Sequence, residues 1–359
     1  MQSNKGRAQM AAAMLTMSAH VMSSAQTAPI QGVAAQEYIR EQERERAQRE
    51  VLQHEADVRL DRGASRVEGP LVVADDAPCF PILRLEARGA LDPRFAAAVQ
   101  ETRQALFGIE LNGPEVCLGA KSVNQVLERI QNRLVERGFV TTRVLAEPQD
   151  LKSGTLVVTV LPGKVRNVQM DDGGSNRGRW WNALPARPGE ILDLRDIEQG
   201  LENFKRVPTA DADIQIAPGE LPGESDIVIR WKQGFPFRMN LSVDDAGSES
   251  TGKYQGSATI SYDHALTLND LLYVTFNHDL GGGESGPRGT RGTTAHYSVP
   301  WGYWLLGVTS SQSTYHQSVA GATQTYVYSG ENQTSDVRLS RLLYRDAVRK
   351  TTATARGWT

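Results

Sequence analysis

Few residues of this sequence could take part in catalysis or in binding a metal or cofactor, and their spacing does not match the motifs that such sites use. Gly281 to Gly286 matches G-x-G-x-x-G, but Pro287 follows and no βαβ unit surrounds it, so the segment predicts a surface loop. No serine lies in a nucleophile elbow, and the acidic pairs at 171–172 and 244–245 read as turn or strand-end carboxylates. The histidines show no metal-ligand spacing; they are His20, His54, His264, His278, His296 and His316. We therefore expect no enzyme, and no catalytic, cofactor-binding or metal site.

Two cysteines, Cys79 and Cys117, are the remaining reactive side chains. An even count in an exported chain indicates one disulfide. On the chain-entropy model a loop of this length would contribute about 3–4 kcal/mol to stability. The alternative is a pair of buried free thiols.

Composition excludes some classes of protein. The net charge is −3, from 39 basic and 42 acidic residues, so no overall field favours nucleic acid. No apolar run reaches the roughly 18 residues that a membrane helix needs. Alternating transmembrane strands would leave the mean hydropathy looking like that of a soluble protein.

The N-terminus, residues 1–25, has the pattern of a signal peptide. Lys5 and Arg7 form a basic region, an apolar stretch runs from Met10 to Met22, and small residues precede Gln26. The alternative is a disordered Ala/Met-rich tail. Residues 26–78 then hold a charge-dense helix, expected from Gln36 to Glu55, and a linker over 61–78. The helix has too few apolar residues to be fixed in a core, so it predicts either a solvated spacer or a helix inside a water-filled pore.

Two small α+β units of order β-α-α-β-β follow, over 79–161 and 164–232. In the first, Asp92 and Pro93 start a helix, and Ser122 with Gln125 predicts a capping box for the next. Strands are expected over 80–87, 139–145 and 155–161. In the second, Asp193 caps a helix with Leu194, Ile197, Leu201 and Phe204 on one face. A short helix is expected over 176–184, and strands over 164–170, 211–217 and 225–231.

From Phe235 to the end, residues 235–359, the hydrophobic period becomes two. Phe237, Met239 and Leu241 alternate with Arg238 and Asn240, and later segments repeat the pattern. Short connections at 264–270 and 301–304 alternate with longer ones at 280–292 and 314–323. Long alternating strands joined in this way predict a transmembrane barrel with a lipid face and a lumen face. A soluble antiparallel sandwich is the alternative.

These features together resemble the two-partner-secretion transporters, the haemolysin and filamentous-haemagglutinin secretion/activation proteins of Gram-negative outer membranes. The resemblance spans roughly residues 36–359. It lies in the Cys79-Phe80-Pro81-Ile82 opening, the two α+β units, the segments VDDAGSESTGKYQGSATISYDHALTLNDLLYVTF and RLSRLLYRDAVRKTTATARGW, and the series Asp245-x-Gly247, Thr251-Gly252, Asp263 and Leu268-Asn269-Asp270.

The resemblance implies a plug-like helix, two POTRA domains in the periplasm and a barrel in the outer membrane. It implies capture of an unfolded exoprotein, such as a haemolysin, adhesin or contact-dependent toxin, by strand addition at the edges 139–145 and 211–217. Outer-membrane lipid would be the other partner, with no nucleic acid and no cofactor. The residues expected to touch the exoprotein are Ile197, Leu201, Phe204, Ile214, Ile216, Val140 and Arg143; for each taken singly, core packing is the simpler interpretation.

The sequence departs from that family in one respect. Only 125 residues follow from Phe235, enough for six or seven strands of about sixteen, so we expect a fragment or a truncated product. The open edge would leave backbone groups unpaired in lipid. Two other functions remain open at this stage: a general barrel-assembly factor, and a soluble periplasmic POTRA binding module.

Overall fold

The computed structural model describes residues 28–52, 56–60, 71–73, 76–89, 92–108, 115–171, 173 and 177–359. The expected signal peptide and most of the expected linker lie outside these residues. The chain forms two units, Met1–Arg44 and Glu45–Thr359. Helix α1 (Ala28–Leu52) begins earlier than the sequence predicted and continues across this division. Among the described residues, no helix is both long enough and apolar enough to cross a membrane.

The first α+β domain contains β1 (Phe80–Ile82), β2 (Arg84–Gly89), α2 (Pro93–Phe107), β3 (Val116–Leu118), α3 (Ala120–Glu136), β4 (Arg143–Leu145) and β5 (Thr155–Leu161). Its main sheet has the order β2-β5-β4, while β1 pairs with β3. A one-turn helix, Leu151–Ser153, precedes β5. Phe95, Ile130 and Leu156 lie in its core. Asp92 caps α2 by accepting a hydrogen bond from the backbone N–H of Arg94, as the sequence predicted.

Two local predictions for this domain are wrong. Helix α3 begins at Ala120, so Ser122 lies inside the helix and is fully buried rather than capping it. The cap comes from Asp76, whose carboxylate accepts from the N–H groups of Lys121 (3.1 Å) and Ser122 (2.6 Å). The strand expected over 139–145 is only Arg143–Leu145, because the chain turns at Gly138 after α3 ends at Glu136 and Phe139 is buried in the core.

Cys79 and Cys117 form a disulfide, with their Cα atoms 5.4 Å apart. The bond lies beside the β1–β3 pair, in which Pro81 is opposite Cys117. It therefore joins the segment that enters the first domain to the strand that leads into α3.

The second α+β domain contains β6 (Lys164–Asp171), α4 (Trp180–Ala183), α5 (Leu194–Lys205), β7 (Ala210–Pro218) and β8 (Glu224–Gln233), with sheet order β6-β8-β7. Asp193 caps α5 as predicted. The short helix expected over 176–184 has only the four residues of α4. The two domains meet where the N–H of Leu194 donates to the carbonyl of Gly138 (2.9 Å).

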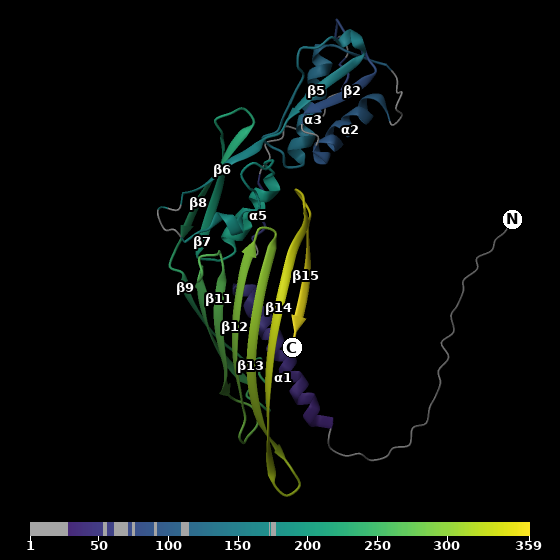
Figure 1. Ribbon diagram of the computed structural model, residues 1–359. Helices are drawn as coiled ribbons and strands as arrows, with labels where there is room; N and C mark the ends of the chain where they lie inside the picture. Colours follow the sequence, from purple (N-terminus) through teal and green to yellow (C-terminus); the bar gives the residue numbers. More distant parts are fainter. Residues whose placement is uncertain are drawn as a thin grey trace, which may run out of the picture. The chain divides into compact units, whose positions relative to one another are not determined.

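The remaining strands form one antiparallel sheet in chain order, as Figure 1 shows. They are β9 (Phe237–Asp244), β10 (Tyr254–Asp263), β11 (Leu271–Gly281), β12 (Gly289–Trp301), β13 (Trp304–Ala320), β14 (Thr325–Arg345) and β15 (Lys350–Trp358). The prediction of a loop over 314–323 is wrong. Strand β13 continues to Ala320, because its backbone pairs with β14 as far as Thr325.

The two faces of this sheet have the reverse of the burial found in a soluble protein. Met239 and Leu241 are 63% and 66% exposed, whereas Thr259 and Ser261 are 2% and 1% exposed. The same alternation continues along β11 and β12, where Phe276 is exposed and Thr275 is buried. An apolar outer face and a polar inner face are what a sheet in lipid requires. The predicted fold class, tandem α+β domains followed by an incomplete antiparallel barrel, is thereby confirmed.

Candidate functional site

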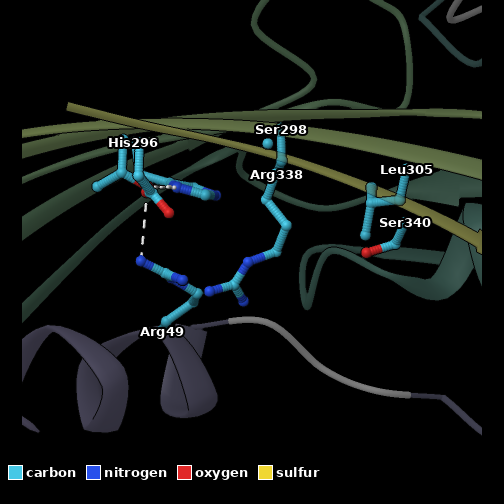
Figure 2. A pocket seen from close by; sticks show the side chains of 9 residues that line it. Arg49, His296, Ser298, Leu305, Arg338 and Ser340 are labelled. Atoms are coloured by element: carbon cyan, nitrogen blue, oxygen red, sulfur yellow. Dashed lines mark hydrogen bonds between the residues drawn. The ribbon is translucent and has the colours of Figure 1, made fainter. Parts of the chain in front are cut away.

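The last turns of α1, from Glu45 onward, lie against the polar face of the sheet. The hydroxyl of Thr294 donates to the Glu45 carboxylate (3.1 Å), and the Arg49 guanidinium donates to the hydroxyl of Thr309 (3.5 Å). Thr309 also bonds to His296 (2.9 Å). Figure 2 shows Arg49 directed toward a small pocket on this face. The pocket is lined by Arg49, His296, Ser298, Leu305, Gly307, Thr309, Asp336, Arg338 and Ser340.

This pocket receives the end of a helix. Its lining combines hydroxyl groups and two guanidinium groups with the side chains of His296 and Asp336. The contacts of Glu45 and Arg49 are side-chain hydrogen bonds to threonines, which are individually weak in a hydrated setting. A polar inner face of this kind can hold a polar helix without an apolar seam.

The residues expected to touch an exoprotein lie mainly in the core of the second domain. Ile197, Leu201, Phe204 and Ile214 are buried there together. Ile216 and Val140 are half-buried and pack against the same cluster, so the structure brings six of the seven together. Arg143 lies apart from them, exposed on β4 of the first domain. Because these side chains are buried or half-buried, the part of this region that another chain can reach is the edge of strand β7.

The two domains differ in how their strand edges are closed. In the first domain the side chain of Gln131 accepts from the N–H of Val144 (3.0 Å) and donates to the carbonyl of Thr142 (2.8 Å). Gln149 makes a corresponding pair of bonds, at 2.7 and 2.8 Å, with Val157 of the central strand β5, beyond the residues of β5 that pair with β4. Each glutamine amide thus takes the place of a neighbouring strand.

Strand β7 of the second domain is also an edge strand, and it pairs only with β8. The N–H of Ala212 bonds to its neighbour Asp211 (2.9 Å), which shows that the even-numbered N–H groups point away from β8. Ile214 and Ile216 share that orientation, because N–H directions alternate along an antiparallel strand. Among the described residues, β7 is the longest strand at an edge of either small domain.

The second domain is docked on the turns at one end of the large sheet. Asn182 donates to the carbonyls of Leu268 (2.5 Å) and Pro300 (3.1 Å), and Asn203 donates to those of Ala183 (2.6 Å) and Gly302 (2.8 Å). Arg206 donates to the hydroxyl and carbonyl of Ser298 and to the carbonyl of Asn269, at 2.9–3.1 Å. All these polar side chains are buried.

Sequence reasoning missed Asn182, Asn203 and Arg206. The one signal was polar residues beside the apolar stripe of α5, where Asn203 precedes Phe204. Their acceptors in the large sheet and its turns lie about 60 to 120 residues away along the chain, so only the folded arrangement identifies them.

Burial changes the pKa of three groups at this junction. Burial raises the pKa of Asp196 to about 6, although the hydroxyl of Tyr303 donates to this carboxylate and opposes the change. Burial lowers the pKa of His264 to about 4, and its ring lies edge-on to Trp231. Burial also lowers the pKa of Arg206 to about 10. The junction is therefore a desolvated polar contact.

Three family models match consecutive parts of the chain. A model described as POTRA domain, ShlB-type matches residues 111–163, and one described as POTRA domain matches 164–218. The model of the haemolysin secretion/activation protein ShlB/FhaC/HecB matches residues 223–359.

Curated relatives match most of the length of this chain. The chain is 38% identical over 328 residues to the outer membrane transporter CdiB-2 of Burkholderia pseudomallei (strain 1026b), covering 89% of the chain and 55% of the relative. It is 26% identical to the hemolysin transporter protein ShlB of Serratia marcescens, covering 71% and 43%. The chain thus spans about half the length of the curated relatives it matches.

Two solved structures show a similar fold. CdiB from Acinetobacter baumannii matches with a TM-score of 0.74 and 24% identity, covering 91% of this chain and 61% of that one. CdiB from Escherichia coli matches with a TM-score of 0.73 and 24% identity, covering 94% and 60%.

Proposed function

Because this chain belongs to the haemolysin secretion/activation family ShlB/FhaC/HecB, we propose that it forms part of a transporter that captures an unfolded exoprotein with its POTRA domains and secretes or activates it. The protein is an outer-membrane protein with its POTRA domains in the periplasm. The observation that carries the proposal is the reversed burial of the large sheet, with the second POTRA domain docked on its turns.

The sheet provides the route across the membrane. Its apolar face contacts outer-membrane lipid, and its polar face lines the path of the exoprotein. This division of the faces disfavours a soluble periplasmic module, because such a module would leave Met239 and Leu241 in water. Transport by this route needs no catalytic group, and we assign none.

The capture edge is β7 of the second POTRA domain. An extended chain added there would pair with the outward N–H groups of Ile214 and Ile216. The first POTRA domain is less suited at its edge strand β4, because Gln131 already bonds to the N–H of Val144 and the carbonyl of Thr142 there. The buried Ile197, Leu201 and Phe204 support β7 from the helix side. The exoprotein would be of the haemolysin, adhesin or contact-dependent toxin type.

Secretion in cells tests both statements. Deletion of the gene should abolish release into the medium of a haemolysin-, adhesin- or toxin-type exoprotein made in the same cells, measured by immunoblot. Ile216→Pro removes one outward N–H of β7 without removing a bond to β8, which an edge strand tolerates. We expect it to lower secretion at least tenfold, whereas Ile216→Val keeps the N–H and should secrete normally.

The two outcomes that would contradict the proposal are separate. Normal secretion after deletion would refute the transporter function. Normal secretion by Ile216→Pro, with the chain present at wild-type level in the outer membrane, would refute capture at β7 alone.

A further inference from the structure

Three exposed tryptophans form a row at the periplasmic end of the large sheet, where the second POTRA domain is docked. Trp301 and Trp304 pair across the turn between β12 and β13, and they are 56% and 39% exposed. Both belong to the apolar face, since side-chain directions alternate along a strand and Leu306 is exposed two residues beyond Trp304. Trp181 of α4 is 39% exposed, and its ring meets that of Trp301 edge-on, with the ring centres 5.1 Å apart. The tryptophan row therefore crosses from the POTRA domain onto the lipid-facing side of the sheet.

Backbone hydrogen bonds on both sides hold Trp181 in this row. The carbonyl of the next residue, Asn182, accepts from the N–H of Gly302 in the turn between β12 and β13 (2.7 Å). The guanidinium of Arg187 donates to the carbonyl of Trp181 (2.7 Å) and lies over the ring of Trp180, 5.7 Å from its centre. The exposed ring of Trp181 thus has a fixed place beside the sheet.

Arg341 of β14 ends the row on the sheet. It is exposed and lies opposite Trp304 in the strand register, with its guanidinium 4.8 Å from the centre of the Trp304 ring. Within the part of the chain that the structure describes, Arg341 makes no ion pair. An arginine on a lipid-facing surface is costly unless its charge reaches the membrane interface. The position of Arg341 near the periplasmic end of its strand places this charge at the level of the lipid headgroups.

The same face offers an apolar track toward the centre of the membrane. Two cross-strand pairs of exposed apolar side chains follow one another on β13 and β14: Leu306 with Leu339, and Val308 with Val337. Arg341 and Trp304 form the next pair of this ladder on the periplasmic side. A cation on an aromatic ring therefore lies directly at the end of a surface suited to hydrocarbon chains.

This combination matches one class of ligand. A guanidinium binds phosphate through paired hydrogen bonds, and stacking on an aromatic ring leaves its N–H groups free to do so. Tryptophan rings favour the interface between hydrocarbon and water, where one side of the ring is apolar and the N–H is hydrated. A phospholipid supplies the phosphate and the acyl chains together. A free phosphate ion would leave the apolar track uncovered.

We propose that Arg341 and Trp304 bind the phosphate of a phospholipid in the periplasmic leaflet, whose acyl chains lie along the track, and that Trp181 anchors the second POTRA domain in the same headgroup layer. The domain is then attached to lipid as well as to the turns of the sheet. The site rests on the outer-membrane location of the chain and not on capture or secretion of an exoprotein.

Native mass spectrometry of the full chain in detergent micelles, titrated with phosphatidylglycerol, tests the phosphate site. Arg341→Gln removes a charge-assisted hydrogen bond and should weaken binding of the first lipid about tenfold. Arg291→Gln is the matched control, because Arg291 is an exposed arginine at the opposite end of the sheet, on β12, and its loss should leave this affinity unchanged. An equal loss of affinity in both variants would overturn the site.

Two further ligands identify the part of the lipid that is bound. Diacylglycerol with the same acyl chains lacks the phosphate and should bind about tenfold more weakly than phosphatidylglycerol. An excess of inorganic phosphate should not displace the lipid, because it cannot cover the apolar track. Equal binding of diacylglycerol would overturn the role of the phosphate, and displacement by inorganic phosphate would overturn a lipid site in favour of a free anion site.

Spin labels test the anchor in vesicles of phosphatidylglycerol and phosphatidylethanolamine. Cys79 and Cys117 form a disulfide, so a single introduced cysteine takes the label. The label in Trp181→Cys should collide with oxygen more often, relative to a water-soluble nickel complex, than the label in Leu221→Cys. Leu221 is the control because it is exposed at the end of β8 opposite to the one that leads into the sheet.

A third label, in Met239→Cys on the apolar face of β9, separates the two ways in which the anchor can fail. Water exposure at 181 equal to that at 221, beside a hydrocarbon signal at 239, would overturn the anchor alone. Aqueous signals at 181 and 239 together would refute the membrane location on which the site rests. Neither measurement involves secretion, so both are independent of the proposed transport.

Discussion

Asp196 gives the most quantitative prediction about the junction between the second POTRA domain and the sheet. Its carboxylate accepts from the hydroxyl of Tyr303, in the turn between β12 and β13, and it also lies near Asp193, Glu190 and Arg94. Burial raises its pKa to about 6, from an ordinary value near 4. A carboxyl with a raised pKa favours the docked state below pH 4, and this contribution is lost as the pH rises through 6.

The size of the effect follows from these values. Each unit of pKa corresponds to about 1.4 kcal/mol, so the full difference in docking free energy is about 3 kcal/mol. Between pH 7.5 and pH 5 about half of it, or 1.4 kcal/mol, should appear. Asp196→Asn removes the charge and should stabilise docking at pH 7.5. The ratio of its docking equilibrium constant to that of the wild type should be about tenfold smaller at pH 5 than at pH 7.5.

Hydrogen exchange of the Gly302 amide measures docking directly, because this N–H donates to the carbonyl of Asn182 across the junction (2.7 Å). The wild-type profile alone is not enough. His264, whose pKa is lowered to about 4, favours docking above pH 6.5 and opposes the trend of Asp196. The ratio of protection in Asp196→Asn to that in the wild type cancels this contribution at each pH.

Asp211→Asn is the matched control. Asp211 is an exposed aspartate of the same domain, and its pKa is lowered by its hydrogen bond from Lys205. Its substitution should leave the protection of Gly302 unchanged at both pH values. A ratio for Asp196→Asn that is the same at pH 7.5 and pH 5 would refute the reasoning.

Two further predictions concern the hinge between the POTRA domains and the faces of the sheet. Gly138 has φ +105°, and a Cβ there would meet the Asp193 carboxylate at 2.5 Å. Gly138→Ala should therefore lower the free energy of unfolding by about 1–3 kcal/mol in thermal unfolding. Gly357→Ala is the control, because a Cβ at Gly357 would have open space around it, and it should leave stability unchanged. An unchanged melting temperature for Gly138→Ala would contradict the strain argument. Spin labels at 237, 239 and 241 should report a hydrocarbon environment, and labels at 238 and 240 should report water. Aqueous signals at all five sites would refute the assignment of a lipid-facing surface.

Local patterns in the sequence determined much of the architecture. A period of two from Phe235 defined the faces of the sheet, because side-chain direction alternates along a strand whatever its partner is. Asp92 and Asp193 marked helix starts, because a cap bonds to N–H groups two residues along the chain. These features depend on neighbours in sequence.

The tertiary structure decided what depends on distant residues. Ser122 had the pattern of a helix cap, but Asp76 performs that role from a segment 46 residues earlier. The end of β13 was set by pairing with β14 and not by its own composition. Gln131 bonds to the N–H of Val144 at the edge of the first sheet. Val58 bonds to Glu202 and to Arg345, which are 144 and 287 residues away along the chain. Both sets of bonds join chain segments that meet only after folding. Backbone groups bond to whatever the fold brings near them, so a local pattern cannot predict these partners.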